Sequence, residues 1–275
     1  MKKKPLMILL LALGVAVFFA LLLYPTVSNY VNTRNQSRVV TNYLDDSVGM
    51  NEGERDALLE AAHAYNRYLL TKKNRYKFTD EETTAYKNLL DTGHGMMGVL
   101  AIDKIGVNLP IYHGTDEGVL QIGIGHLHGS SLPVGGSGTH TVITGHRGLP
   151  SSKLLTNLDR LMEGDLFVLH ILDETLTYQV DQILTVKPEE VNSLDIERGM
   201  DYCTLVTCTP YGKNTHRLLV RGNRVENVEG PGGEAGHTGM TPASGALITG
   251  MCMILLLSAF LIYVFLRWRK TRKGG

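Results

Sequence analysis

Two apolar runs joined by a polar connection make up the stretch "TLVTCTPYGKNTHRLLVRG", Thr204–Gly222. Side chains alternate between the faces of a strand, so Val206 and Cys208 share one face of the first run. In the second run Arg217 shares a face with Leu219 by the same rule. If the six-residue connection "PYGKNT" returns the chain as a hairpin, Arg217 lies beside Cys208. The pattern therefore predicts paired strands on which a cysteine and an arginine meet.

A cysteine at the end of a strand is rigidly held and still accessible, which suits a nucleophile. A thiol reacts as its thiolate, and a neighbouring positive charge favours that form. An arginine can also stabilise the oxyanion that develops when an acyl carbon is attacked. The alternative is that Thr204–Gly222 is an ordinary core hairpin and that Cys208 only fills space.

Acyl transfer through a cysteine also needs a group that protonates the leaving amine, and histidine is the usual one. His146 in "THTVITGHRGLP" follows a strand-like run and sits in a glycine-flanked turn, so it is the best candidate. His140 lies at the other end of that run and is expected to bind a backbone group. His126 and His128 in "GHLHG" could suggest a metal, but no cysteine or carboxylate cluster accompanies them, so no metal is expected.

From Met97 onward the chain consists of short runs rich in β-branched residues and separated by Gly, Pro, Asn and Asp. Seven or eight strands at this spacing predict a mainly β fold, either a closed barrel or a sandwich. Two short helices are expected to interrupt it, at 153–161 and 188–194. The strand-like runs are "MGVLAID", "VNLPIYHG", "THTVITG", "GDLFVLHI", "TLTYQVDQILTV", "YCTLVTCT" and "HRLLVRG".

Helical signals precede these runs. Asn51 with Glu54 is a capping pair that opens a helix to about residue 70, and Thr79 with Glu82 opens a second one to about residue 90. The charged loop "TKKNRYKF" separates the two helices. Residues 26–50 are polar and mixed, without a strong period.

Both ends carry long uncharged segments flanked by basic clusters. The first runs from Pro5 to Tyr24 and the second from Gly245 to Leu266, each long enough to cross a bilayer as a helix. Lys and Arg stay on the cytoplasmic side, so both termini are expected inside and the middle outside. The first segment is expected to be an uncleaved anchor, with a secretory signal peptide as the alternative.

Charge and cysteine content exclude other classes. Without the eight basic residues at the two ends, 19 basic residues face 27 acidic ones, the opposite of what a nucleic-acid binder needs. Cys252 lies inside the second apolar segment. Cys203 and Cys208 point to opposite faces of one strand and cannot pair, so Cys203 is expected in the core and Cys208 as a free thiol.

The combination of "TLVTCTPYG", "THRLLVRG", "VITGHRGLP", "LPIYHG" and "SLPVGG" closely resembles the sortases, in detail the class C, pilin-polymerising sortases. The resemblance is strong over residues 97–225. It implies an eight-stranded β-barrel with an N-terminal helical extension. It also implies that Cys208 is the nucleophile, His146 the general acid/base, and Arg217 the residue that positions substrate and stabilises the oxyanion.

The implied reaction is transpeptidation, with no cofactor. The thiolate attacks the threonine carbonyl of an LPxTG-like sorting signal on a pilin or other surface protein, and a lysine of the next pilin resolves the thioester. Anchoring of surface proteins to cell-wall peptide is the alternative within the family. A generic surface cysteine hydrolase and a non-catalytic barrel scaffold are the alternatives outside it, and the sequence leaves the oligomeric state open.

Many class C sortases close the site with a lid that carries Asp-Pro followed by an aromatic residue, and the loop at about residues 70–80 departs from that pattern. Phe78 can take the aromatic place, but Tyr76 and Lys77 stand where Asp and Pro are expected. The sequence therefore predicts no acid-to-thiol latch. The lid is either held by packing of Phe78 or Tyr76 or leaves the site largely open, and deleting residues 75–78 is expected to change peptide turnover only modestly.

The expected organisation follows from these segments. It is an anchor or signal segment (1–25), a helical extension (26–96), a catalytic barrel (97–225), a Gly/Pro-rich linker (226–244), a transmembrane helix (245–266) and a basic cytoplasmic tail (267–275).

Overall fold

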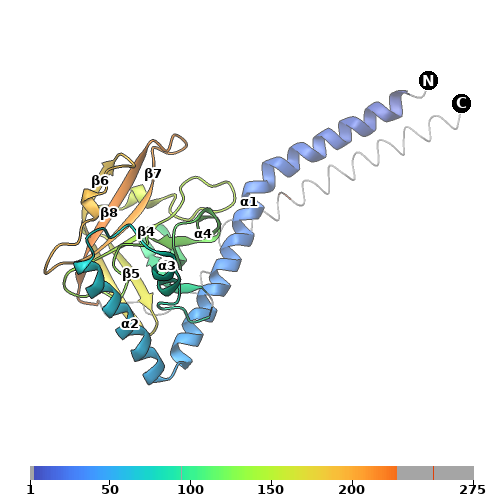
Figure 1. The fold of residues 1–275 in the computed structure, drawn as a ribbon. Coiled ribbons are helices and arrows are strands. Elements are labelled where there is room, and N and C mark those ends of the chain that lie inside the picture. The colour runs from blue at the N-terminus through green and yellow to red at the C-terminus, as the bar shows by residue number, and fades with distance from the viewer. Residues whose placement is uncertain (1–2, 94, 228–249, 251–275) are drawn as a thin grey trace, which may run out of the picture. The chain divides into compact units, whose positions relative to one another are not determined.

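The computed structural model describes residues 3–93, 95–227 and 250. The chain divides into two compact units, residues 1–31 with 235–275 and residues 32–234. In the second unit the described strands close into one barrel (Figure 1). They are β1 (Met96–Ile102), β2 (Val107–His113), β3 (Ile124–His126), β4 (Thr139–Thr144), β5 (Leu166–Ile171), β6 (Glu174–Val186), β7 (Asp201–Thr209) and β8 (His216–Val225).

The order of strands around the barrel is β1-β2-β3-β4-β7-β8-β6-β5, and pairing of β1 with β5 closes it. Most neighbours are antiparallel, while β2 pairs with β3 and β4 with β7 in parallel. The prediction of a mainly β fold is thus confirmed, and of the two architectures left open the barrel is the one observed. Since β7 lies between β4 and β8, residues from three separate stretches of sequence meet around its carboxyl end.

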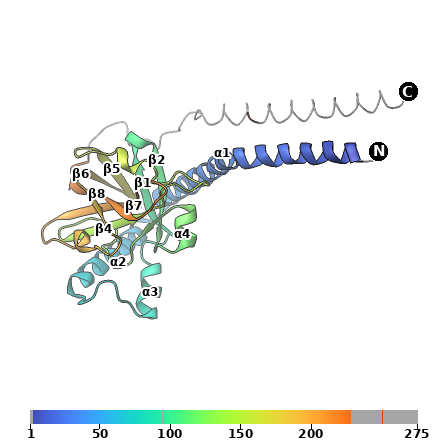
Figure 2. The same cartoon turned by 90° about the horizontal axis from the view of Figure 1, so that it is seen from above.

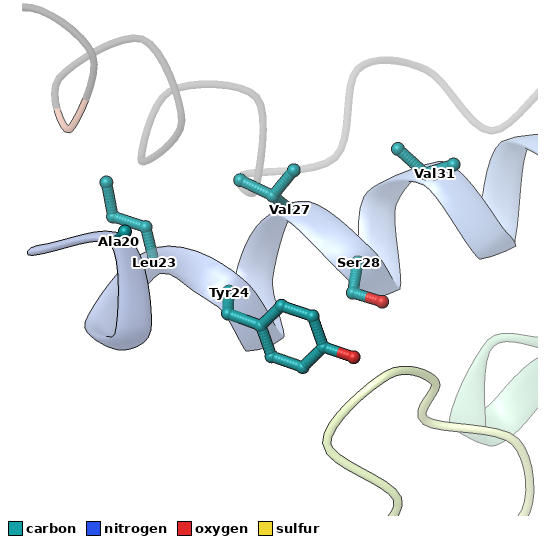
Figure 3. Close-up of a pocket in the computed structure, with 6 residues that line it drawn as sticks. All are labelled: Ala20, Leu23, Tyr24, Val27, Ser28 and Val31. Atoms are coloured by element: carbon teal, nitrogen blue, oxygen red, sulfur yellow. The ribbon is translucent and has the colours of Figure 1, made fainter. Parts of the chain in front are cut away.

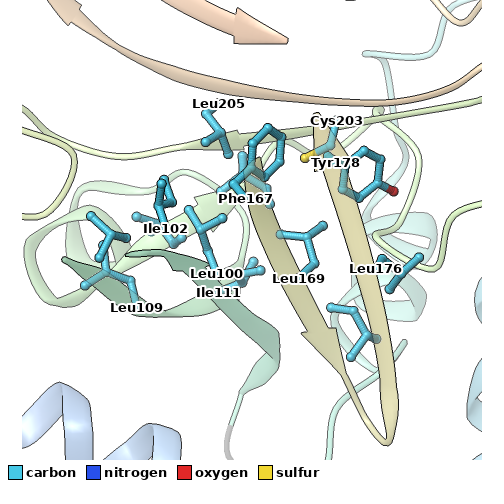
Figure 4. Packing of buried hydrophobic residues seen from close by; sticks show 14 of the residues in the cluster. Leu100, Ile102, Leu109, Ile111, Phe167, Leu169, Leu176, Tyr178, Cys203 and Leu205 are labelled. Carbon is cyan, nitrogen blue, oxygen red and sulfur yellow. The ribbon is translucent and has the colours of Figure 1, made fainter. Parts of the chain in front are cut away.

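Large apolar side chains fill the barrel (Figure 4). Leu100, Phe167 and Leu205 are all at most 1% exposed. Cys203 is fully buried among them, which confirms its expected place in the core. Burial of this much apolar surface is the main contribution to the stability of such a fold.

Two helices between the N-terminal helix and the barrel follow the predicted caps. α2 (Glu52–Thr71) begins where the Asn51 side chain accepts a hydrogen bond from the Glu54 backbone at 2.9 Å. α3 (Asp80–Lys87) begins with a capping box formed by Thr79 and Glu82. Both helices lie outside the barrel on the same side of it (Figure 2).

The N-terminal helix is longer than the sequence indicated. α1 (Lys3–Gly49) is one continuous helix that contains Pro25, whereas no strong period was found in residues 26–50. Gln36, Val40 and Tyr43 of its last turns are almost fully buried. Polar side chains in this stripe are satisfied by hydrogen bonds: Gln36 Nε2 donates to the Ile122 carbonyl at 2.9 Å. The buried face of this part of α1 mixes polar and apolar residues and therefore has a weak hydrophobic period. For this reason the sequence did not predict a helix over residues 26–50.

Within the described residues, one helix is long and apolar enough to cross a membrane, the segment Leu13–Gly49 near the N-terminus. A signal sequence would pass the same test of length and composition. The expected linker, second span and basic tail at 228–275 lie outside the described residues, apart from Gly250.

The short connections differ from expectation in detail. The helices expected at 153–161 and 188–194 are single 3-10 turns, Leu158–Arg160 and Asn192–Leu194. The sequence analysis missed α4 (Glu117–Ile122) and the three-residue strand β3. Both elements are too short to build up a recognisable period.

Candidate active site

The hairpin of β7 and β8 brings Cys208 and Arg217 together. The two residues are direct partners in the antiparallel register, as the sequence analysis predicted. Directly opposed residues on one face have Cβ atoms about 5 Å apart. Cys208 is a free, half-buried thiol next to the last residue of β7.

The face of the sheet that carries Cys208 is apolar. Val206 and Leu219, which share the parity of Cys208 and Arg217, belong to an outer cluster separate from the barrel core. Leu205 and Leu218, with the opposite parity, point into the core. The outer cluster consists of Val142, Leu194 and Leu219 with the partly exposed Leu127, Leu184, Val186 and Val206.

His146 follows β4, which runs parallel to β7. The last register pair is Thr144 with Val206, and the Gly145 backbone continues the ladder by donating to the Val206 carbonyl at 3.1 Å. Extending this register by two residues sets His146 alongside Cys208. The sequence alone did not predict where His146 lies relative to Cys208. The parallel pairing of β4 with β7 indicates that the two residues are neighbours.

Glycine is required at position 145 for this arrangement. A Cβ atom there would lie 2.7 Å from Cγ2 of Ile124, closer than real Cβ contacts allow, and would also be crowded by Leu155 at 3.0 Å. The Gly145 carbonyl also accepts a hydrogen bond from the Thr207 hydroxyl at 2.8 Å. Thr207 directly precedes Cys208, so the N–H and the carbonyl of Gly145 both bind the strand that carries the cysteine.

The His146 side chain is 25% exposed. Its Nε2 atom is shielded from solvent and has no hydrogen-bond partner among the described residues. The Glu117 carboxylate on α4 faces it, with Oε2 3.6 Å from Nε2. The sequence analysis did not single out Glu117, because nothing in the local pattern indicates that α4 packs near residue 146.

The Arg217 guanidinium contacts backbone carbonyl groups, with Nη1 3.2 Å from the His216 oxygen and 3.4 Å from that of Asn214. Across residues 3–93 and 95–227 no carboxylate pairs with it at salt-bridge distance. Its charge is therefore available to a bound group at the end of β7.

The loop between α2 and α3 packs on the barrel through aromatic rings. Phe78 stacks on His128 with ring centroids 3.5 Å apart, and His128 stacks on Tyr86 at 4.0 Å. Tyr76 covers Gly129, where an added Cβ would meet its Cδ1 atom at 2.8 Å. Lys77 is exposed. The loop is thus attached through Phe78 and Tyr76, together with an ion pair of Arg75 with Asp195 at 2.7 Å.

Two other histidines of the barrel, His140 and His126, have structural roles. His140 lies between the Asp195 carbonyl at 2.8 Å and the Thr204 hydroxyl at 2.7 Å, as expected of a residue that binds a backbone group. His126 is fully buried, and burial lowers its pKa to about 3. Within the described residues no three His, Cys, Asp or Glu side chains gather closely enough to hold a metal ion.

A hollow on α1 is lined by Ala20, Leu23, Tyr24, Val27, Ser28 and Val31 (Figure 3). All six residues belong to the helix segment that is apolar enough to cross a membrane. Such a surface is suited to lipid or to another helix, and none of the candidate site residues contributes to it.

A barrel that holds a free thiol beside an arginine, with a histidine just after the neighbouring strand, is the framework of a cysteine acyltransferase. Comparison with known proteins agrees: the family model "Sortase domain" matches residues 100–225. Sortase C1 from Streptococcus agalactiae is 50% identical with a TM-score of 0.67, and the match covers 70% of this chain and 100% of that one. The chain belongs to the sortase family of cysteine transpeptidases.

Two further relatives support this assignment. Sortase C from Streptococcus pneumoniae is 45% identical with a TM-score of 0.64, and the match covers 69% of this chain and 97% of that one. A protein named Sortase A from Streptococcus agalactiae is 28% identical over 179 residues, which is 58% of this chain and 72% of the relative. The resemblance stated from the sequence is confirmed at the level of the family.

Proposed function

We propose that Cys208 is the nucleophile of this transpeptidase, His146 its general acid/base, and Arg217 the residue that positions the substrate and stabilises the oxyanion. The direct pairing of Cys208 with Arg217 carries the proposal. Support for His146 comes from the parallel register of β4 with β7 and from its partial exposure. A thiolate, a proton donor and a fixed cation are the groups that acyl transfer to an amine requires.

The reaction runs in two steps. In the first, the Cys208 sulfur attacks the threonine carbonyl of an LPxTG-like sorting signal, and Arg217 donates hydrogen bonds to the oxyanion. The carbon–nitrogen bond to glycine then breaks, and the departing amine takes a proton from His146. In the second, an acceptor amine attacks the thioester, the sulfur leaves as thiolate, and the proton of the amine returns to His146.

The proposed substrates are pilin subunits, joined through a lysine side chain of the next subunit. Support comes from the relatives at 45–50% identity, which are C-type sortases, one of them described with a pilin substrate specificity. The outer cluster offers partly exposed apolar side chains on the face that carries Cys208, which suits the leucine and proline of such a signal.

Anchoring of surface proteins to cell-wall peptide is the second candidate. It is favoured by the match to the protein named Sortase A. That match is weaker in identity than those to the C-type sortases, so polymerisation of pilins remains the first candidate.

The proposed location is the cell membrane, with two spans, both termini in the cytoplasm and the barrel outside. The apolar helix Leu13–Gly49 supports the first span. The uncharged segment Gly245–Leu266 and its basic flank support the second from the sequence alone. Substrates that are themselves attached to the membrane would then meet the enzyme in two dimensions.

The test is incubation of the full chain, in lipid nanodiscs, with a candidate pilin that carries a sorting signal. Covalent ladders are expected with the native chain and none with Cys208→Ala, His146→Ala or Arg217→Ala. Cys203→Ala is the matched control, because it removes a thiol from the same strand on the opposite face. Ladders that persist in Cys208→Ala would refute the proposal. Single transfers to a cell-wall peptide without ladders would support the second candidate.

A further inference from the structure

We propose that Glu117 is a positioning residue for His146, holding the imidazolium with Nε2 turned toward α4. The inference rests on the proposed function, because it matters for catalysis only if His146 exchanges the proton. It starts from one observation: the Glu117 carboxylate faces a shielded ring nitrogen that has no hydrogen-bond partner among the described residues.

The contact has the geometry of an ion pair. At 3.6 Å between Oε2 of Glu117 and Nε2 of His146, it is slightly longer than a direct hydrogen bond. The attraction is strongest when the ring carries both protons, and it is weaker for a neutral ring with its proton on Nε2. In either form the carboxylate turns Nε2 toward α4 and leaves Nδ1 for the proton that is exchanged with the substrate amine.

Glu117 is held in place by its own helix. Its Oε1 accepts a hydrogen bond from Gln121 Nε2, one helical turn later, at 2.5 Å, which leaves Oε2 for His146. The carboxyl end of α4 is fixed in turn, because the Ile122 carbonyl accepts a hydrogen bond from Gln36 of α1. Gly123 follows, and a Cβ there would lie 2.7 Å from the Tyr112 ring. The acid is thus presented by a braced element.

The other charges around His146 do not duplicate this contact. Arg147 pairs with Asp159, and Cys208 and Arg217 lie on the neighbouring strands β7 and β8. Hydrogen bonding from Gln121 lowers the pKa of Glu117, and the positive charge of His146 lowers it further. Glu117 therefore stays ionised throughout the working range of the enzyme.

The consequence for the mechanism concerns which ring atom carries the mobile proton. With Nε2 facing Glu117, Nδ1 is the atom that releases its proton to the glycine amine when the thioester forms and regains one from the acceptor amine. Glu117 keeps its charge in both steps. It orients the ring, as a third residue does in other nucleophile–base pairs.

The test compares the full chain in nanodiscs with Glu117→Gln, using cleavage of a fluorescent sorting peptide across pH. Without the carboxylate the ring is no longer held with Nε2 toward α4, so the proton donor is misplaced and turnover of the peptide is expected to fall. The loss is modest because the Glu117 side chain is 71% exposed. We expect kcat to fall by roughly threefold to tenfold with KM changed less than twofold.

Asp116→Asn is the matched control, because it removes the same charge one residue earlier, and among the described residues only Glu117 lies at ion-pair distance from His146. It should leave kcat within about twofold of the native value, and the difference in kcat between native and Glu117→Gln chains should shrink in about 1 M salt, where exposed charges are screened. Equal kcat values in native and Glu117→Gln chains, or an equal loss in Asp116→Asn, would overturn the inference.

A second measurement separates this inference from the proposed function. The His146 ring signal can be followed by NMR in ¹³C-histidine-labelled chain, with its assignment made through His146→Gln. At one fixed pH its chemical shift is expected to move in Glu117→Gln and not in Asp116→Asn, whether or not the peptide is cleaved, because the ring loses the carboxylate beside Nε2. An unmoved signal contradicts the role of Glu117. A moved signal in a chain whose Cys208→Ala variant still cleaves the peptide would contradict the proposed function instead.

Discussion

At the scale of single residues, Gly125 of β3 shows how closely the backbone segments approach one another beside the histidine strand. A Cβ atom at this position would lie 2.1 Å from the carbonyl oxygen of Gly114, and a backbone atom cannot move aside as a side-chain tip can. We expect Gly125→Ala to lower the free energy of unfolding by about 3 kcal/mol. Thermal or denaturant unfolding in detergent measures it.

Gly118→Ala is the control for that prediction. Gly118 lies in α4 with no atom within 4 Å of an added Cβ. Alanine there should be neutral or stabilise the chain by about 0.5 kcal/mol, since alanine favours helix more than glycine does. Equal losses in the two variants would contradict the argument from close approach.

Arg147, the residue after His146, gives a second prediction at this scale. Its side chain is 9% exposed, pairs with Asp159, and donates from Nη1 to the Thr209 hydroxyl at 3.3 Å. Because Thr209 follows Cys208, this arginine connects the histidine loop with the end of the cysteine strand. Arg147→Ala leaves these partners unpaired and is expected to cost about 2 kcal/mol of unfolding free energy.

Arg67→Ala is the comparison for Arg147. The pair of Arg67 with Glu60 has both side chains largely exposed, 62% and 70%, so its loss should cost less than about 0.5 kcal/mol. Denaturant unfolding of the two variants ranks them, and the reverse order would contradict the role given to Arg147. The sequence did not predict a role for Arg147, because its partner Thr209 is 62 residues further along the chain.

At the scale of elements, the loop between α2 and α3 depends on the stack of Phe78, His128 and Tyr86. Burial lowers the pKa of His128 from 6.5 to about 4. A lowered pKa means that the folded chain prefers the neutral ring. Its contribution to stability is therefore complete above about pH 6.5 and is lost as the pH falls from 6.5 through 4.

The prediction is that His128→Phe, which keeps an aromatic ring in the stack, loses less stability than the native chain between pH 7 and pH 4.5. Melting temperatures across this range measure it. His126 is present in both proteins, and burial, the larger cause, lowers its pKa to about 3 in each, so most of its acid sensitivity is common to the two. Melting curves that fall in parallel would mean that His128 does not sense pH in the fold.

Local patterns predicted several elements correctly because their causes are local. Alternation along Thr204–Gly222 was sufficient for the pairing of Cys208 with Arg217, since a hairpin joins neighbours in sequence. The caps at Asn51 and Thr79 likewise depend on residues three positions apart. The contact of His146 with Glu117 could not be predicted, because it needs the packing of α4 against a strand end.

The loop between α2 and α3 was predicted only in part. Replacement of Asp and Pro by Tyr76 and Lys77 was visible in the sequence, and attachment by packing of Phe78 or Tyr76 was one of the two alternatives left open. The partner of Phe78 was not visible, since His128 comes from the loop after β3, a strand that was itself missed. Whether the loop closes the site during turnover stays a prediction.

At the scale of the whole molecule, the proposed reaction is shaped by where the barrel is held. Both substrates of a pilin polymerase are attached to the membrane, so anchoring raises the concentration at which enzyme and substrate meet without any new contact. In the proposed function the barrel with α2, α3 and the last turns of α1 carries out the reaction. The apolar segments at the two ends of the chain would only hold the enzyme near its membrane-attached substrates.

Removal of residues 228–275 separates these contributions, because the described barrel ends before them. Turnover of a soluble sorting peptide is expected to stay within about twofold of the full chain, since a free peptide gains nothing from a tether. Formation of pilin ladders in membranes is expected to fall several-fold at most, because the proposed second anchor no longer restrains the barrel while the N-terminal helix still holds the chain at the membrane. A matched chain in which the linker 226–244 is doubled in length should keep most of its ladder formation, because the cost of a flexible linker grows only slowly with length. If the truncation reduces peptide turnover and ladder formation equally, the C-terminal segment stabilises the barrel itself, and the division between chemistry and proximity is wrong.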